Sequence, residues 1–269
     1  MVTWMSSLPT WVLVLGWLGL ALLVATVGRV GGRALVPERE RDHIPLVAPP
    51  LMPALGAVFA IFAALTLAGE AGYLRTAETQ VSDEAAASSR LAWAATSPGV
   101  DSVSVQAALH DYMVATRAGE WEEADTAGTD DPETARDLAT LERVVRDQAA
   151  RTGIGSPAST ELLASLDAVT SSRRARVAES SREIPALYVL TLVAAGLALI
   201  FNAGALTVRS GLRTAVLAGG LACVVGLSLA LLFSITAPWR GPLVVSGRPM
   251  DTVISDLESG FFDSGPPAP

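Results

Sequence analysis

Four long stretches of the chain contain no Asp, Glu, Lys, Arg or His: Met1–Gly28, Ile44–Gly69, Ile184–Val208 and Thr214–Trp239. Each is longer than the roughly 20 apolar residues that a helix needs to span a hydrocarbon core of about 30 Å. An apolar fraction of 51% with only 17% charged residues is also typical of a membrane protein. The sequence therefore predicts four transmembrane helices, at residues 10–30, 52–72, 186–207 and 214–237.

The segment between the second and third predicted spans has the pattern of a helical domain. Its apolar residues recur at helical spacing, and it has little strand signal. Three places carry residues that favour the start of a helix: Asp101, Asp131-Pro132-Glu133 and Ser156-Pro157. We therefore predict an all-α integral membrane protein with a helical extramembrane domain at 73–183. A tail at 240–269 is predicted to hold one short helix, at 250–257, and to be disordered over its last six residues.

The second span passes into the polar segment without an intervening proline, which predicts one helix continuing to about Thr96. One face of this span collects mostly small and polar residues: Gly56, Phe59, Ala63, Thr66 and Glu70. Such a face in a spanning helix packs against protein or faces water, so we interpret these five residues as candidates for lining a pore. The simpler alternative is that Glu70 lies at the level of the lipid headgroups, where the helix leaves the bilayer.

Glu84 and the basic pair Arg173 and Arg174 lie at similar distances from the predicted membrane edge. At 1.5 Å per residue, straight helices would place them about 17 Å from the bilayer. Arg173 also falls on the apolar stripe of its helix, where a buried cation needs a carboxylate partner. We therefore predict an ion pair of Glu84 with Arg173 or Arg174 that joins the two helices. The alternative is a solvated charged face.

Several functions are not expected from this sequence. The two histidines, His43 and His110, lack neighbours at metal-ligand spacing, so no metal site is predicted. No nucleotide-binding fingerprint or nucleophile with a nearby base is present, so neither catalysis nor a cofactor is expected. The net charge of -8, carried mainly between the second and third spans, argues against nucleic acid as a partner.

The chain carries several short motifs, each once and in this order: Val81-x-x-Glu84-Ala85-x-Ala87, Tyr112 before Glu120-Trp121, Arg173-Arg174-x-Arg176 before Ile184–Tyr188, and Pro238-Trp239-x-Gly241 before Val245-Ser246. Their order and spacing resemble the bacterial bestrophin-like domain membrane proteins. His43 resembles a loop histidine of that family, although the residues that follow it depart from the usual pattern. Trp239 stands where phenylalanine is usual.

The resemblance implies a likeness to bestrophins, which are pentameric anion channels. In those channels the second spanning helix lines the pore and continues into a helical extramembrane domain. The implied function is a homo-oligomeric ion channel, a pentamer by analogy, in which the second span lines the pore. The alternative is a non-conducting membrane scaffold or sensor whose helical domain binds a protein or another ligand. In either case the lipid bilayer is a partner.

The basic residues indicate the source and the orientation of the protein. All 19 are arginine, a bias typical of a high-GC bacterial genome, so we expect a multi-pass protein of the bacterial plasma membrane. The short loops between spans carry Arg29, Arg33, Arg209 and Arg213. Because positive charge favours the cytoplasmic side, this places the helical domain outside the cytoplasm. Arg75 and Arg173, which flank the spans on the domain side, favour the opposite orientation. We expect the extracytoplasmic one.

Overall fold

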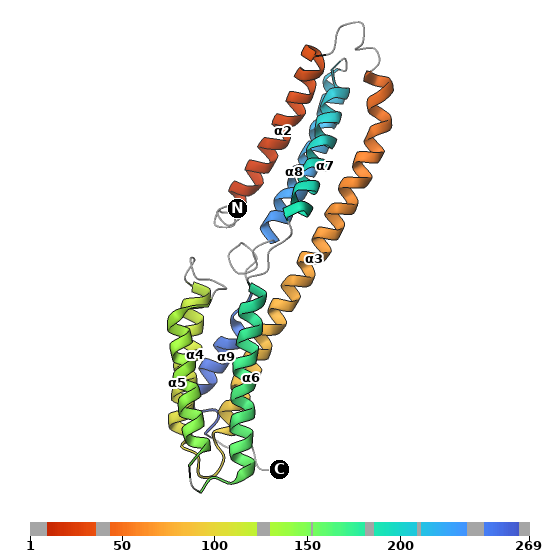
Figure 1. Cartoon of the computed structure of the whole chain (residues 1–269). Coiled ribbons are helices and arrows are strands. Elements are labelled where there is room, and N and C mark those ends of the chain that lie inside the picture. The colour runs from red at the N-terminus through yellow and green to blue at the C-terminus, as the bar shows by residue number, and fades with distance from the viewer. Residues whose placement is uncertain are drawn as a thin grey trace, which may run out of the picture. The chain divides into compact units, whose positions relative to one another are not determined.

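A computed structural model describes residues 10–35, 44–122, 130–151, 153–180, 186–208, 211–235 and 245–263. The described residues form helices and their connections, without a strand, as the all-α prediction required (Figure 1). The chain divides into two compact units. Unit 1 comprises Met1–Gly72 and Glu183–Leu243, and unit 2 comprises Tyr73–Arg182 and Val244–Pro269.

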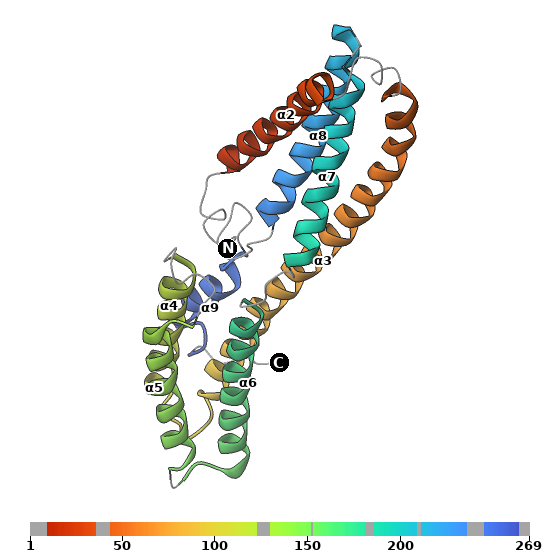
Figure 2. The same cartoon turned by 45° about the horizontal axis from the view of Figure 1, so that its top comes forward.

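Unit 1 contains four helices that are long and apolar enough to cross a membrane: α2 (Thr10–Leu35), the N-terminal part of α3 (Ile44–Ala94), α7 (Ala186–Leu206) and α8 (Leu212–Ile235). They cover the described residues of the four stretches predicted as spans, except for residue 207, which α7 does not reach. Residues 236–237 lie outside the described part of the chain. Helices α2, α7 and α8 lie side by side in both views (Figures 1 and 2).

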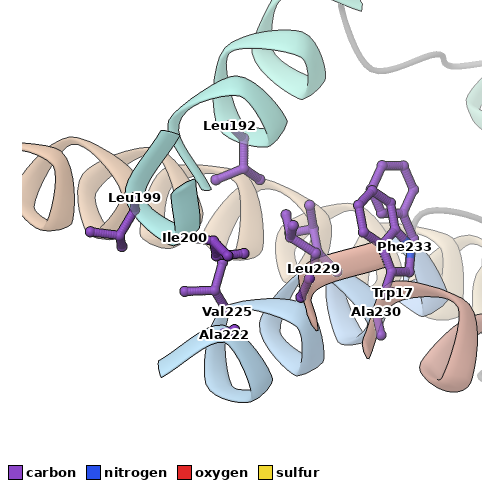
Figure 3. Close-up of a cluster of buried hydrophobic side chains, with 11 residues drawn as sticks. Trp17, Leu192, Leu199, Ile200, Ala222, Val225, Leu229, Ala230 and Phe233 are labelled. Atoms are coloured by element: carbon purple, nitrogen blue, oxygen red, sulfur yellow. The ribbon is translucent and has the colours of Figure 1, made fainter. Parts of the chain in front are cut away.

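Unit 1 contains a cluster of buried apolar side chains. Trp17 of α2 stacks on Phe233 of α8 with ring centroids 4.9 Å apart, and Leu229 lies next to them (Figure 3). Ile200 of α7 is fully buried in the same cluster. Phe59 of α3 packs against the cluster while remaining partly exposed. Burial of apolar side chains from all four helices therefore holds unit 1 together.

Two glycines set the close approach of α2 and α7. A Cβ at Gly28 would collide with the backbone carbonyl of Phe201 in α7. Reciprocally, a Cβ at Gly204 in α7 would collide with the backbone carbonyl of Ala25 in α2. Small residues at such crossings let helix backbones approach closely, which is a common way for membrane helices to pack. The contact between α2 and α7 therefore depends on the absence of side chains at these two positions.

Unit 2 is built from the C-terminal part of α3 together with α4 (Ser102–Arg117), the π-helix η2 (Ala118–Glu122), α5 (Pro132–Ala149), α6 (Ser156–Ser180) and α9 (Arg248–Glu258). The predicted helix starts are confirmed. The Asp101 side chain accepts a hydrogen bond from the Ser104 N–H at the start of α4, and Asp131 does the same for Thr134 in α5. Gly99, beyond the end of α3, has a φ of 86°, a conformation that glycine adopts without strain.

The tail helix is confirmed and belongs to unit 2. It was predicted at 250–257, and α9 runs from Arg248 to Glu258. Met250 and Val253 on its inner face are buried. The described part of the tail, from residue 245, is therefore part of unit 2, which the sequence did not indicate.

Replacement of Gly28 by alanine should destabilise the protein, because the new methyl group meets backbone, which cannot rotate away. Overpacking of this kind typically costs about 1–3 kcal/mol. Thermal unfolding of the protein in detergent measures the effect. Gly19→Ala is a matched control on the same helix, since nothing lies within 4 Å of its Cβ position. The control should be neutral or stabilising by up to about 1 kcal/mol, because alanine favours helix. Equal effects at both positions would contradict the close contact of α2 and α7.

Candidate functional site

Four charged side chains lie together inside unit 2: Glu84 of α3, Glu120 of η2, and Arg173 and Arg176 of α6. We call them the buried charge network. Glu84, Glu120 and Arg176 are completely inaccessible to solvent, and Arg173 is 6% exposed. The effective penalty for burying an ion is several kcal/mol unless opposite charges and hydrogen bonds offset it. The geometry of their pairing is therefore decisive for the stability of unit 2.

Arg176 connects the two buried glutamates. Its Nε lies 2.6 Å from Oε2 of Glu84, and its Nη2 lies 2.5 Å from Oε2 of Glu120. The guanidinium carbon is 4.9 Å from the ring centroid of Trp121, a distance suited to a cation–π contact. Burial alone would lower the pKa of Arg176, but the charges of Glu84 and Glu120 outweigh burial and raise it. A single permanent cation therefore links α3, η2 and α6.

Arg173 extends the network towards solvent. Its Nη2 lies 2.7 Å from Oε1 of Glu120 and 2.8 Å from Oδ1 of Asp130. The Asp130 side chain is 62% exposed, so it marks the edge of the network. Burial acts to lower the pKa of Arg173, but the charge of Glu120 and the hydrogen bonds more than compensate for it. Arg173 therefore also remains a cation.

Tyr112 of α4 completes the coordination of Glu84. Its hydroxyl donates a hydrogen bond to Oε1 of Glu84. Tyr112 is fully buried, and burial, followed by the negative charge of Glu84, raises its pKa well above the ordinary value. The phenol therefore keeps its proton and acts as a donor, which brings α4 into contact with the network.

The ion pair predicted from the sequence needs a correction. Glu84 pairs with Arg176, not with Arg173 or Arg174. Arg173 is buried as expected, but its carboxylate partners are Glu120 and Asp130, and Arg174 lies on the exposed side of α6. Arg173 and Arg176 lie on the same face about one turn apart, and one turn is within the error of a height estimated from chain length. The estimated height along the helices therefore identified the correct group of arginines, but not Arg176 as the one that pairs with Glu84.

Glu120 was missed because its backbone conformation was not foreseen. The sequence predicted that the second helix of the domain stops near Gly119, but the chain continues as η2. A Cβ at Gly119 would lie 2.8 Å from Oδ2 of Asp131, so glycine is needed for α5 to start this close. The wider π turn brings Glu120 to the interior. The motif Glu120-Trp121 was the only sequence signal for this arrangement.

The face of α3 that was predicted to line a pore packs within the chain. Thr66 and Glu70 are each only 7% exposed, whereas Val58, Ile61 and Leu65 on the opposite face are 43%, 58% and 59% exposed. The other three candidates, Gly56, Phe59 and Ala63, are half-buried. Phe59 and Ala63 pack against the apolar core of unit 1. This packing argues against a lumen along that face.

A model of the bestrophin-like domain matches residues 19–250. The chain belongs to the bestrophin-like domain family. The match includes the whole buried charge network and most of the four apolar helices, and it ends within α9. Searches among curated proteins and among solved structures gave no match.

Some predicted features of this bestrophin-like protein lie outside the described residues. They are His43, Ile184-Pro185, the Pro238-Trp239-x-Gly241 motif and the last six residues. His110 is described, and it contacts two carboxylates, of Asp111 and Glu258. Among the described residues, no group of three or more His, Cys, Asp or Glu side chains is placed to hold a metal ion.

Removal of the Arg176 charge in the bestrophin-like protein should be strongly destabilising. Arg176→Met leaves Glu84 and Glu120 buried without their shared cation, and such a loss typically costs about 3–5 kcal/mol. The free energy of unfolding in denaturant measures it. Arg174→Met on the same helix is the control, because it removes an exposed charge, and it should change stability by about 0.5 kcal/mol or less.

A double-mutant cycle tests the corrected pairing. The effects of Glu84→Gln and Arg176→Met should be strongly non-additive, because the two side chains contact each other. Those of Glu84→Gln and Arg174→Met should add to within about 0.5 kcal/mol. If the effects of Glu84→Gln and Arg176→Met were additive while those of Glu84→Gln and Arg174→Met were not, the pairing with Arg174 expected from the sequence would be favoured instead.

Alkaline titration should report the burial of Tyr112. Because the pKa of Tyr112 is raised in the folded protein, folding favours its protonated form, and this contribution is lost as the pH rises above about 10, where tyrosine in an unfolded chain ionises. Tyrosinate absorbance should show Tyr112 ionising only with unfolding of unit 2. The titration of Tyr112→Phe should lack that step, and a wild-type Tyr112 that ionises in the folded state near pH 10 would contradict its burial.

Proposed function

We propose that this bestrophin-like protein is a four-span integral membrane protein with its spans at 10–30, 52–72, 186–207 and 214–237. The length and composition of α2, the first part of α3, α7 and α8 support this proposal. So does membership of the bestrophin-like family. Residues 73–183, together with α9, then form a helical domain outside the bilayer.

We further propose that copies of the chain assemble into an ion channel with α3 lining the pore. The observation that carries this proposal is the exposure of α3. Only 6% of its most apolar stretch is buried within the chain, compared with 22% in α2 and 39% in both α7 and α8. An apolar helix surface of this extent is covered by lipid or by another copy of the chain. A helix left open by its own chain is suited to lie at the axis of an oligomer.

The exposed side of α3 divides into two neighbouring stripes. One contains bulky residues, Val58, Ile61 and Leu65, and the other contains small exposed residues: Ala57, Ala60, Ala64 and Ala68. Small residues permit close approach of neighbouring helices, whereas bulky apolar side chains suit contact with lipid. The alanine stripe is therefore the side proposed to face the other copies of α3 and the pore between them, in place of the face with Thr66 and Glu70.

The charge distribution supports an orientation with the helical domain outside the cytoplasm of a bacterial cell. The short loops before α3 and before α8 carry arginines, and such loops favour the cytoplasmic side. Labelling of Val103→Cys, at a site that is 74% exposed on α4, with a membrane-impermeant thiol reagent in intact cells tests this orientation. Labelling only after cell lysis would place the domain in the cytoplasm.

A non-conducting scaffold or sensor is the second candidate function. It is favoured by the burial of Thr66 and Glu70, because the exposed side of the α3 span is then apolar and offers no polar lining. In this alternative the helical domain binds a protein or another ligand. Neither proposal involves catalysis or a cofactor.

Ion flux from proteoliposomes, with the subunit number fixed by native mass spectrometry, tests the channel proposal. The only cysteine, Cys223, is first replaced by serine. Ala64→Cys then probes the alanine stripe, and Ala63→Cys is its matched control, since Ala63 packs inside unit 1. A charged thiol reagent should change the flux of Ala64→Cys severalfold, through its charge in the pore, and leave that of Ala63→Cys unchanged.

The outcomes separate the proposals. If the thiol reagent changed the flux of Ala63→Cys alone, the pore face predicted from the sequence would be favoured instead. A ring of subunits without flux, or a monomer, would favour the scaffold or sensor.

A further inference from the structure

In unit 2, α3 and α6 each have one exposed face. On α3 the exposed residues are Thr79, Ser82, Asp83, Ala86 and Arg90, and on α6 they are Ala164, Asp167, Ser171 and Arg174. We call these two sets the outer faces. Each points away from the buried charge network, into which α3 directs Glu84 and α6 directs Arg176. The outer faces are therefore the sides on which these helices can meet a partner outside the chain.

The outer faces combine small side chains with charges. Apart from the aspartates and arginines they consist of alanine, serine and threonine, which allow helices to pack at a short interaxial distance. Within the described part of the chain, none of the four charged side chains, Asp83, Arg90, Asp167 and Arg174, has an ion-pair partner. Their charges are therefore available to pair with another molecule.

The charges on the two outer faces have the same order and the same spacing. Asp83 precedes Arg90 by seven residues on α3, and Asp167 precedes Arg174 by seven residues on α6. Seven residues make about two helical turns, so the two charges of each face lie about 10.5 Å apart along the axis. Two helices with this pattern place each aspartate opposite an arginine when they run antiparallel. When they run parallel, like charges are opposed.

Helices α3 and α6 run antiparallel in unit 2 (Figures 1 and 2). Near the start of this part of α3, the hydroxyl of Tyr73 donates to the carbonyl oxygen of Glu179, near the end of α6, at 2.8 Å. Beyond the other end of α3, a Cβ at Gly99 would lie 3.5 Å from the carbonyl oxygen of Gly153, which precedes α6. Copies related by rotation about an axis along these helices keep every residue at its level. The α6 of one copy would therefore also be antiparallel to the α3 of the next.

The levels of the charges along the helices also match. Interpolation between these two contacts places each aspartate about five residues, or roughly 7.5 Å along the axis, from the arginine of the other face. Side chains in a helix lean towards its N-terminus. For both Arg90 and Arg174 this is the direction of the opposing aspartate, so each guanidinium extends towards the level of the carboxylate. Ser82 and Ser171 lie at nearly the same level.

We propose that the outer face of α3 binds the outer face of α6 in a second copy of this chain. In this interface Asp83 pairs with Arg174 of the neighbouring copy, and Arg90 pairs with Asp167. Because the two faces differ, each copy binds one neighbour through α3 and another through α6, and such head-to-tail contacts can close into a ring. Exposed ion pairs fix the register of an interface more than they strengthen it. The interface rests on the proposed oligomer but not on ion conduction.

Disulfide cross-linking of the full-length protein in isolated membranes tests the interface. Ser82→Cys and Ser171→Cys are combined in a Cys223→Ser background, because a disulfide needs Cα atoms within about 7 Å. Oxidation should join copies into a covalent ladder that ends at the size of the complete ring. Ser82→Cys combined with Val103→Cys, at an exposed site on α4, is the control and should remain monomeric. The absence of a ladder from the first combination would overturn the proposal.

Charge reversal assigns the interface to the ion pairs. Asp83→Arg should raise the protein concentration at which the oligomer dissociates in detergent about fivefold, because repulsion replaces attraction at an exposed pair. Arg174→Asp in the same chain should restore the wild-type value. Asp147→Arg, the same reversal at an exposed position of α5, is the control and should have no effect. Native mass spectrometry over a dilution series measures the dissociation. A second reversal that does not restore assembly would overturn the pairing.

These results are distinguishable from a failure of the channel proposal. A cross-linked ring that passes no ions would support the interface and reject the channel. Ion flux from a ring that does not cross-link at these positions would reject the interface and leave the channel proposal intact. A protein that is monomeric in membranes would overturn the interface.

Discussion

The ion pairs of Arg176 determine how unit 2 is assembled. Its guanidinium lies between two fully buried carboxylates, which come from α3 and η2. Neither Glu84 nor Glu120 could remain ionised in the interior without a cation, because the loss of solvation would exceed what neutral hydrogen bonds return. Each element of the network is thereby fixed in rotation: α6 must direct Arg176 inwards, and η2 must direct Glu120 towards it. Apolar packing alone would tolerate more than one rotation of these helices.

Unit 1 is held together mainly by apolar packing rather than by buried ion pairs. Its helices are apolar around most of their surface, and a helix satisfies its own backbone hydrogen bonds, which is a requirement in a bilayer. Specific packing then rests on shape. Gly28 and Gly204 let α2 and α7 approach until backbone meets backbone, and the stacked rings of Trp17 and Phe233 fill the space between α2 and α8. The exposed span of α3 is the exception, and the proposed oligomer would cover it.

Helix α3 is the element shared by both units. Its apolar part belongs to unit 1, and its polar part carries Glu84 into the charge network of unit 2. Phe261 and Phe262, which follow α9, contact the same helix through Trp93. In a channel with α3 at its axis, the network would hold the pore helix within the helical domain. In a scaffold or sensor, the same contacts would transmit a shift of that helix. Either proposed function would therefore act through α3.

The sequence by itself determined the features that depend on neighbours along the chain. The length of each apolar stretch predicted the four apolar helices, and the caps Asp101 and Asp131 predicted where α4 and α5 begin. Helical spacing also predicted that Arg173 is buried. Each of these follows from a few residues, because hydrogen-bond caps and hydrophobic periodicity act locally.

Only the tertiary structure decided which face of α3 is covered and which carboxylate meets which arginine. The periodicity of α3 separated a small and polar face from a bulky one, but both faces lie in an apolar helix and either could pack inwards. Glu84 pairs with Arg176, and the π-helix η2 brings a second carboxylate, Glu120, within reach of both Arg173 and Arg176. Such choices depend on the rotation and spacing of helices that are distant in the chain, and no local rule fixes these.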